Sequence, residues 1–116
     1  MQKTISLLIF LLLILSCKKV DTDRQNQIAY TVYSATDLPT DTINYFNVKI
    51  LNEKQEFILF ENQHRFQYSF TTMGKGKAAI EAVSLDSIPL VAVITQNGIR
   101  IAQQSGLNVK IEKEFK

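Results

Sequence analysis

Hydrophobic residues are arranged in two different ways along the chain. Residues 5–15 form an almost unbroken apolar run, preceded by the charge of Lys3 and followed by Ser16 and Cys17. Beyond residue 27, apolar and polar residues alternate over short stretches, which is the period of a β-strand with one buried face. The pattern therefore divides the chain into an apolar leader and a β-rich remainder.

The alternating stretches predict seven or eight strands, at residues 28–34, 43–51, 57–60, 65–72, from 78 onward, 90–95, 99–103 and 107–112. β-Branched and aromatic residues dominate their apolar positions, and no stretch has apolar residues spaced by three and four over three helical turns. We therefore expect an all-β protein with little or no helix.

Turn signals separate these strands at intervals typical of an antiparallel sandwich or barrel. Asn97 and Gly98 between two apolar runs predict a β-hairpin with a type I′ turn. The segment 73–77, with two glycines, predicts another turn, with a plain hairpin as the favoured form. Of the two architectures we favour a small immunoglobulin-like antiparallel β-sandwich over residues 28–116.

The core of such a domain is expected to depend on aromatic residues, because one cysteine cannot form an internal disulfide. In the strand 43–51 the even-numbered face, which carries Asn44 and Phe46, is the expected core side. The aromatic residues expected to hold the core include Phe46, Phe57, Phe60, Phe66, Tyr68 and Phe70.

The apolar leader has the organisation of a secretory signal peptide. Residues 5–15 are too few to span a bilayer, which needs roughly 20 apolar residues, and they fit the apolar region of a signal. Ile14, Leu15, Ser16 and Cys17 resemble the lipobox of bacterial lipoproteins. That resemblance implies cleavage between Ser16 and Cys17, acylation of Cys17 and attachment to the membrane through the acyl chains.

These features give three expected segments: a cleaved signal peptide at 1–16, a lipidated cysteine with a flexible polar tether at 17–27, and the sandwich at 28–116. Lys18 follows the cysteine where an aspartate resembles an inner-membrane retention signal, so the expected location is the outer membrane. Whether the domain faces the periplasm or the cell surface is left open.

Charge excludes one class of partner. The chain has 13 Lys and Arg, and loss of Lys3 with the signal leaves 12 basic against 11 acidic side chains. A nearly neutral domain lacks the basic footprint of a nucleic-acid-binding protein.

Candidate chemistry is sparse, and no enzyme, metal or cofactor is expected. His64 is the single histidine and is expected in an exposed turn, with neither a second histidine nor a set of metal ligands nearby. The pairs Glu53 with Glu56 and Asp37 with Asp41 fall in expected loops, where solvated charge is the favoured interpretation. Lys75 and Lys77 could contact an anion or a partner, although their sequence is not a P-loop.

The mature sequence resembles a known family at the level of strand spacing. The matching residues are Tyr30, Thr31 and Val32, then Ile43, Asn44 and Tyr45, then residues 66–70, Ala82, Val93 and Ile94, and finally Asn97, Gly98 and Gly106. This pattern is similar to the extracytoplasmic domain of the mycobacterial membrane protein small family. The resemblance implies an immunoglobulin-like sandwich on a membrane tether that acts as an accessory subunit of a lipid-exporting transporter. This chain lacks the cysteine pair of many members, and its expected anchor is lipidated Cys17 where the family typically uses a transmembrane helix.

Three functions remain open from the sequence. The leading hypothesis is a non-enzymatic, lipid-anchored module that binds an envelope protein complex or transporter. The second is a small inhibitor or immunity-type lipoprotein that uses one exposed loop, at residues 34–42 or 61–65. The third is a carrier that holds an apolar ligand between its sheets.

Overall fold

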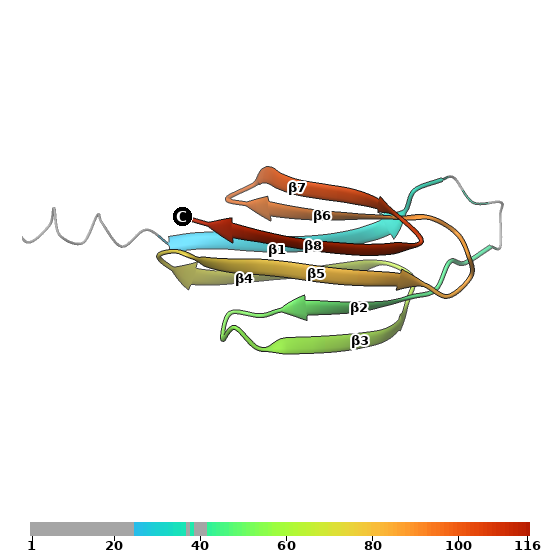
Figure 1. Ribbon diagram of the computed structural model, residues 1–116, viewed down its shortest axis with the longest axis horizontal. Helices are drawn as coiled ribbons and strands as arrows, with labels where there is room; N and C mark the ends of the chain where they lie inside the picture. The colour runs from blue at the N-terminus through green and yellow to red at the C-terminus, as the bar shows by residue number, and fades with distance from the viewer. Residues whose placement is uncertain (1–24, 37, 39–41) are drawn as a thin grey trace, which may run out of the picture.

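The computed structural model describes residues 25–36, 38 and 42–116. Its eight strands are β1 (Gln25–Ser34), β2 (Phe46–Leu51), β3 (Phe57–Gln63), β4 (Phe66–Met73), β5 (Gly76–Ser84), β6 (Leu90–Gln96), β7 (Ile99–Gly106) and β8 (Asn108–Phe115). They form two layers (Figure 1). Sheet A has the order β4-β1-β6-β7, and sheet B has the order β3-β2-β5-β8.

The architecture confirms the all-β sandwich that the sequence predicts. Every pairing between neighbouring strands is antiparallel. Within the described part of the chain there is no helix, and so none that could cross a membrane.

The strand pairings match much of an immunoglobulin-like sandwich. In that fold strand B pairs with E, and strands C′, C, F and G follow one another in the second sheet. Here β1 with β4 reproduces the first pairing, and β3-β2-β5-β8 reproduces the second sheet. The hairpin of β6 and β7 lies on the other side of β1, where an immunoglobulin domain has its first strand.

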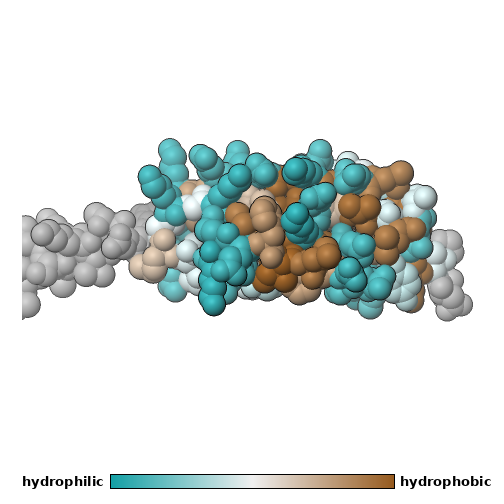
Figure 2. All heavy atoms as spheres, turned by 60° about the horizontal axis from the view of Figure 1, so that its bottom comes forward, coloured by the Kyte–Doolittle hydropathy of each residue, from teal (hydrophilic) through white to brown (hydrophobic). Residues whose placement is uncertain are grey.

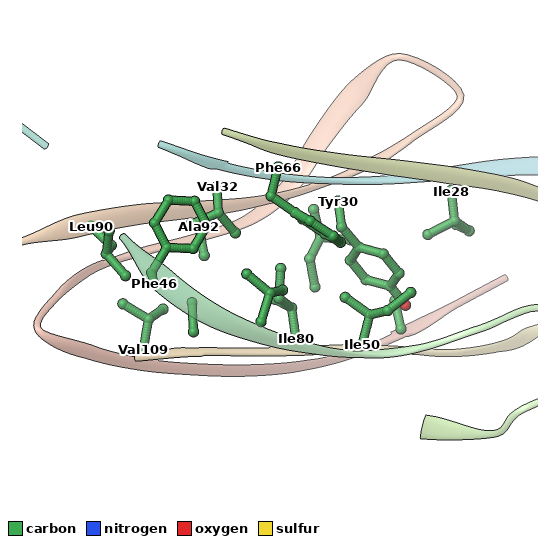
Figure 3. Packing of buried hydrophobic residues seen from close by; sticks show 14 of the residues in the cluster. Ile28, Tyr30, Val32, Phe46, Ile50, Phe66, Ile80, Leu90, Ala92 and Val109 are labelled. Carbon is green, nitrogen blue, oxygen red and sulfur yellow. The ribbon is translucent and has the colours of Figure 1, made fainter. Parts of the chain in front are cut away.

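The core lies between the two sheets and is filled by one face of each strand (Figure 3). Ile28, Tyr30 and Val32 of β1 share this face, and they are almost completely buried. On β2 the even-numbered face is the buried one, as predicted. In β5 and β6 several inward residues are alanines, which let the two sheets approach closely.

One aromatic residue expected in the core lies outside it. Phe57 is 59% exposed, because it is on the outer face of β3 at the edge of sheet B. The ammonium of Lys49 lies 4.8 Å from the centre of its ring. The short apolar run at the start of β3 does not show from sequence alone which of its two faces is buried.

One of the two expected hairpin turns is confirmed, and the other is wrong. Asn97 has φ 53° and Gly98 has φ 82°, which is the backbone of the predicted type I′ turn, and β6 and β7 pair as a hairpin. The second turn, at Gly74 and Lys75, is not a plain hairpin. It joins β4 of sheet A to β5 of sheet B, so the two strands it connects do not pair with each other.

Several strands continue past their expected ends: β3 to Gln63, β7 to Gly106 and β8 to Phe115. Two further differences in strand bounds involve side-chain hydrogen bonds. β1 begins at Gln25, so residues 25–27, which the polar composition assigned to the tether, belong to the sandwich. Asn26 explains this extension, because its side chain is only 2% exposed and is held by hydrogen bonds. β2 begins at Phe46, because residues 43–45 are held mainly by side-chain hydrogen bonds instead of a strand ladder.

The two long sides of the sandwich are closed in different ways. On one side β7 and β8 lie close together and are joined by the single residue Leu107. On the other side β3 and β4 belong to different sheets, and aromatic rings fill the space between them. The Phe60 and Phe66 rings are 5.0 Å apart, and those of Phe60 and Tyr68 are 6.0 Å apart.

Candidate binding surface

The loops opposite the start of β1 form the candidate surface. β1 enters the sandwich at one end, and because all pairings are antiparallel the connections gather at its two ends (Figure 1). The end away from Gln25 contains the segment after β1, the link from β3 to β4, the loop from β5 to β6 and the link from β7 to β8. We call it the far end.

A hollow of about 340 Å³ lies at the far end. Its lining includes Tyr33, Ile43 and Asn44 from β1 and the approach to β2, together with His64 and Arg65 from the link between β3 and β4. The described residues of the segment 34–42 therefore meet His64 and Arg65 in one place, whereas residues 61–63 of the second expected loop belong to β3. Asp37 and Asp41 lie outside the described residues.

Three large side chains at the far end are exposed. Tyr33 is 43% exposed, Ile43 is 49% exposed and Tyr45 is 40% exposed. The Tyr45 ring meets the His64 ring edge to face, with their centres 6.2 Å apart. Tyrosine and arginine are among the residues that most often dominate the energy of protein interfaces.

A buried asparagine fixes the backbone beneath this surface. Asn44 is 1% exposed, and its amide nitrogen donates to the Ser34 hydroxyl at 3.1 Å and to the Ile88 carbonyl at 3.3 Å. Its amide oxygen accepts from the Ser84 hydroxyl at 3.3 Å. Asn44 therefore ties β1, the approach to β2 and the loop after β5 together.

Tyr45 is positioned by two backbone hydrogen bonds. Its N–H donates to the Asp86 carboxylate at 2.6 Å, and its carbonyl accepts from the Leu85 N–H at 2.9 Å. A side chain held on such a fixed backbone loses less conformational entropy when a partner binds.

The titratable side chains described at the far end are spread apart. His64 is exposed and its ring lies against that of Tyr45, and among the described residues no carboxylate forms an ion pair with it. Among the described residues no three His, Cys, Asp or Glu side chains are grouped as metal ligands. Glu53 and Glu56 lie in the β2–β3 connection, at the opposite end of the sandwich.

The structure places Lys75 and Lys77 at the end where β1 begins. Both line an open hollow together with Lys116 and Glu114. The ammonium of Lys77 pairs with the Glu112 carboxylate at 3.1 Å, which leaves it less available to an anion. Ser16 and Cys17 lie outside the described residues.

Sequence reasoning missed the polar groups that organise the interior. Asn26 donates to the carbonyls of Gly74 at 2.8 Å and Lys116 at 3.1 Å, and accepts from the amides of Gln96 and Asn97. Asn26 lies in a polar stretch near the start of the domain, and such a stretch normally indicates a tether. Only the three-dimensional neighbours of Asn26 show that it closes this end.

Tyr30 joins the sheets through its hydroxyl. The O–H donates to the Leu51 carbonyl at 2.7 Å and accepts from the Ala79 N–H at 3.2 Å. Burial raises the pKa of Tyr30 to about 12, although the hydrogen bond from Ala79 opposes the shift. The hydroxyl is therefore protonated at neutral pH, and its two hydrogen bonds link sheet A to sheet B.

Comparison of the sequence with models of known protein families and with curated proteins finds no match.

Proposed function

We propose that this protein is a lipid-anchored envelope lipoprotein that works without catalysis, by binding a protein partner through the far end of its sandwich. The anchor is Cys17, which becomes the first residue when the signal peptide is cut after Ser16. The partner is a component of an envelope complex, with a transporter as the finer hypothesis from the family resemblance.

One observation carries the proposal. Tyr33, Ile43 and Tyr45 are exposed together with His64 and Arg65 on a rigid backbone, at the end of the sandwich opposite Gln25. A tether that leaves from the other end keeps this surface accessible.

The interior favours surface binding over the carrier alternative. The inward positions of the described strands are filled by packed side chains, several of them fully buried (Figure 3). A carrier needs a cavity between its sheets that takes most of the ligand's surface. An inhibitor role remains the second candidate, because the far-end hollow joins both loops suggested for it.

The anchor is tested by the intact mass of the protein from the membrane fraction of its native host. We expect a chain that starts at Cys17 and carries added acyl groups. A Cys17→Ala variant should remain unprocessed and unacylated. A wild-type chain that keeps residues 1–16 without added mass would contradict the anchor.

The binding surface is tested by a photoreactive amino acid placed at Tyr45 and, in a matched control, at Thr71 on β4. Both positions are exposed, and they lie near opposite ends of the sandwich. We expect a cross-link to a defined envelope protein from position 45 alone, which Arg65→Ala should weaken. Equal cross-linking from both positions would contradict a far-end site.

A further inference from the structure

The four sheet edges of the sandwich differ in chemistry. β4 and β7 border sheet A, and β3 and β8 border sheet B. Edge strands present unpaired backbone groups, and proteins protect them with charged or polar side chains. β8 has Lys110, Glu112 and Glu114 on its outer face, and β4 has Gln67 and Ser69.

β3 lacks this protection at its start. Phe57 is 59% exposed and Leu59 is 56% exposed on its outer face. Ile58 and Phe60 face inward but are only partly buried. Figure 2 brings this side of the molecule forward and shows hydrophobic surface between groups of hydrophilic side chains.

The hairpin of β2 and β3 shows which backbone groups are free. Asn52 N–H donates to the Glu56 carbonyl at 2.9 Å, and hydrogen-bonded pairs alternate along an antiparallel ladder. Starting from the Asn52–Glu56 pair, every second pair exchanges hydrogen bonds, and these are Ile50 with Ile58 and Val48 with Phe60. The N–H and C=O of Phe57 and Leu59 therefore point away from β2, toward an additional strand.

We propose that the β3 edge pairs with β3 of a second copy of this chain, antiparallel and centred on Leu59. In this register Leu59 lies opposite Leu59 of the second copy, and Ile58 lies opposite Phe60. Residues that share a face in each copy remain on the same face, as a continuous sheet requires. The partly buried side chains of Ile58 and Phe60 in the two copies then shield each other from solvent.

Charge supports a second copy as the occupant. In this register exposed Glu61 of one copy, which lies where a bulge interrupts the β2–β3 pairing after Phe60, comes opposite Phe57 of the other. The Phe57 ring carries the Lys49 ammonium at 4.8 Å. The Glu61 carboxylate of each copy thus approaches the Lys49 ammonium of the other. The two-fold symmetry of the dimer gives two such contacts.

The pairing is geometrically compatible with an anchor at Cys17, as proposed above. Antiparallel edges place the two Gln25 residues on opposite sides of the two-fold axis, toward opposite ends of the dimer. A dimer whose strands lie along the membrane lets both chains reach the same surface. The pairing itself does not depend on the anchor.

The test uses cysteine cross-linking in the full chain, solubilised from membranes in detergent. Directly opposed residues in a hydrogen-bonded antiparallel pair have Cα atoms about 5.5 Å apart, which suits a disulfide. Leu59→Cys should form a covalent dimer under mild oxidation. Gln67→Cys on β4 and Glu112→Cys on β8 are exposed controls that should not, and the wild-type chain measures any contribution from Cys17.

The register is tested by two further variants. Phe57→Cys alone should cross-link poorly, because the two copies of residue 57 are four residues apart along the pairing. The double variant Phe57→Cys/Glu61→Cys should restore the dimer. Equal dimer yields from every cysteine position, or Leu59→Cys linked to another protein instead of itself, would overturn the proposal.

A second measurement separates pairing from folding. Leu59→Glu puts two like charges opposite each other in the dimer, which disfavours a strand pair, while within one copy residue 59 lies opposite Lys49, beside which a carboxylate is tolerated. We expect the dimer dissociation constant from light scattering to rise about tenfold or more, with an unchanged thermal transition. An unchanged dissociation constant would overturn the self-pairing.

Discussion

The two long sides of the sandwich achieve closure by different means. Where β7 and β8 meet, the backbones are close, and the Lys110 N–H donates to the Gln104 side chain at 3.0 Å. Where β3 and β4 meet, Phe60, Phe66 and Tyr68 fill the space with rings. Packing aromatic rings between β3 and β4 requires apolar residues near the surface. The same side of the sandwich therefore contains the β3 edge that lacks charged side chains at its start.

The largest expected effect comes from removing a ring on the β3–β4 side. Phe66 is 7% exposed, and Phe66→Ala should lower the free energy of unfolding by about 3–5 kcal/mol. Denaturant titration measures this loss. On the β7–β8 side, Ile111→Ala removes a partly buried side chain and should cost about 1–2 kcal/mol. A cost at Ile111 equal to that at Phe66 would contradict the distinction.

The next effect depends on pH and concerns Tyr30, whose ring is 6.0 Å from that of Phe70. Because the folded pKa is about 12 and the ordinary value is 10.0, unfolding releases the proton more easily. The stabilisation is complete below pH 10 and is lost as pH rises toward 12, by about 2–3 kcal/mol.

Tyr30→Phe provides the comparison for this pH dependence. The variant should lose about 1–2 kcal/mol at pH 7, because the Leu51 carbonyl and the Ala79 N–H lose their partner. Denaturant titrations from pH 8 to pH 12 should show the wild type losing its advantage. Parallel pH profiles for the two proteins would show that Tyr30 does not cause the alkaline loss.

A smaller effect tests the close packing between β5 and β8. A Cβ atom on Gly76 would lie 2.7 Å from the Phe115 ring, so Gly76→Ala should cost about 1–3 kcal/mol. The double variant with Phe115→Leu should lose less than the sum of the two single changes, because the clash is relieved. Additive losses measured by thermal unfolding would argue against this contact.

The smallest effect concerns the charges that protect β8. Lys77 and Glu112 are about half exposed, so Lys77→Ala should change the free energy of unfolding by no more than about 0.5 kcal/mol. Lys77→Ala is expected to change mainly the self-association of the protein, because the charge beside the β8 edge is reduced. Sedimentation at rising protein concentration measures that change, and a large loss of stability would show that the pair has a structural role.

Much of the fold could be predicted because local pattern and tertiary structure agree. The alternation in β2 identified its buried face, and the Asn97–Gly98 turn was predicted with its conformation. The exposed position of Phe57 could not be predicted, because the apolar run in β3 is hydrophobic on both faces. What decides its exposure is the place of β3 at the edge of sheet B.

The candidate surface was predictable only in pieces. The sequence predicts loops at residues 34–42 and 61–65; residues 61–63 are instead part of β3, and the sandwich topology brings His64 and Arg65 to the hollow beside Ser34, Thr36 and Thr42. Asn44 was placed on the core face, but its role depends on Ser34, Ser84 and Ile88, which are distant in sequence. Hydrogen bonds between distant residues leave no periodic signal.

The central place of β1 in sheet A has a mechanical consequence. β1 pairs with β4 over eight residues and with β6 over seven, and its backbone hydrogen bonds run across the strand. A force that pulls on Gln25 along β1 loads both ladders in shear, so many bonds must yield together. The same force applied across the β6–β7 hairpin would open one bond at a time. The domain should therefore resist tension best along the direction in which its own chain enters.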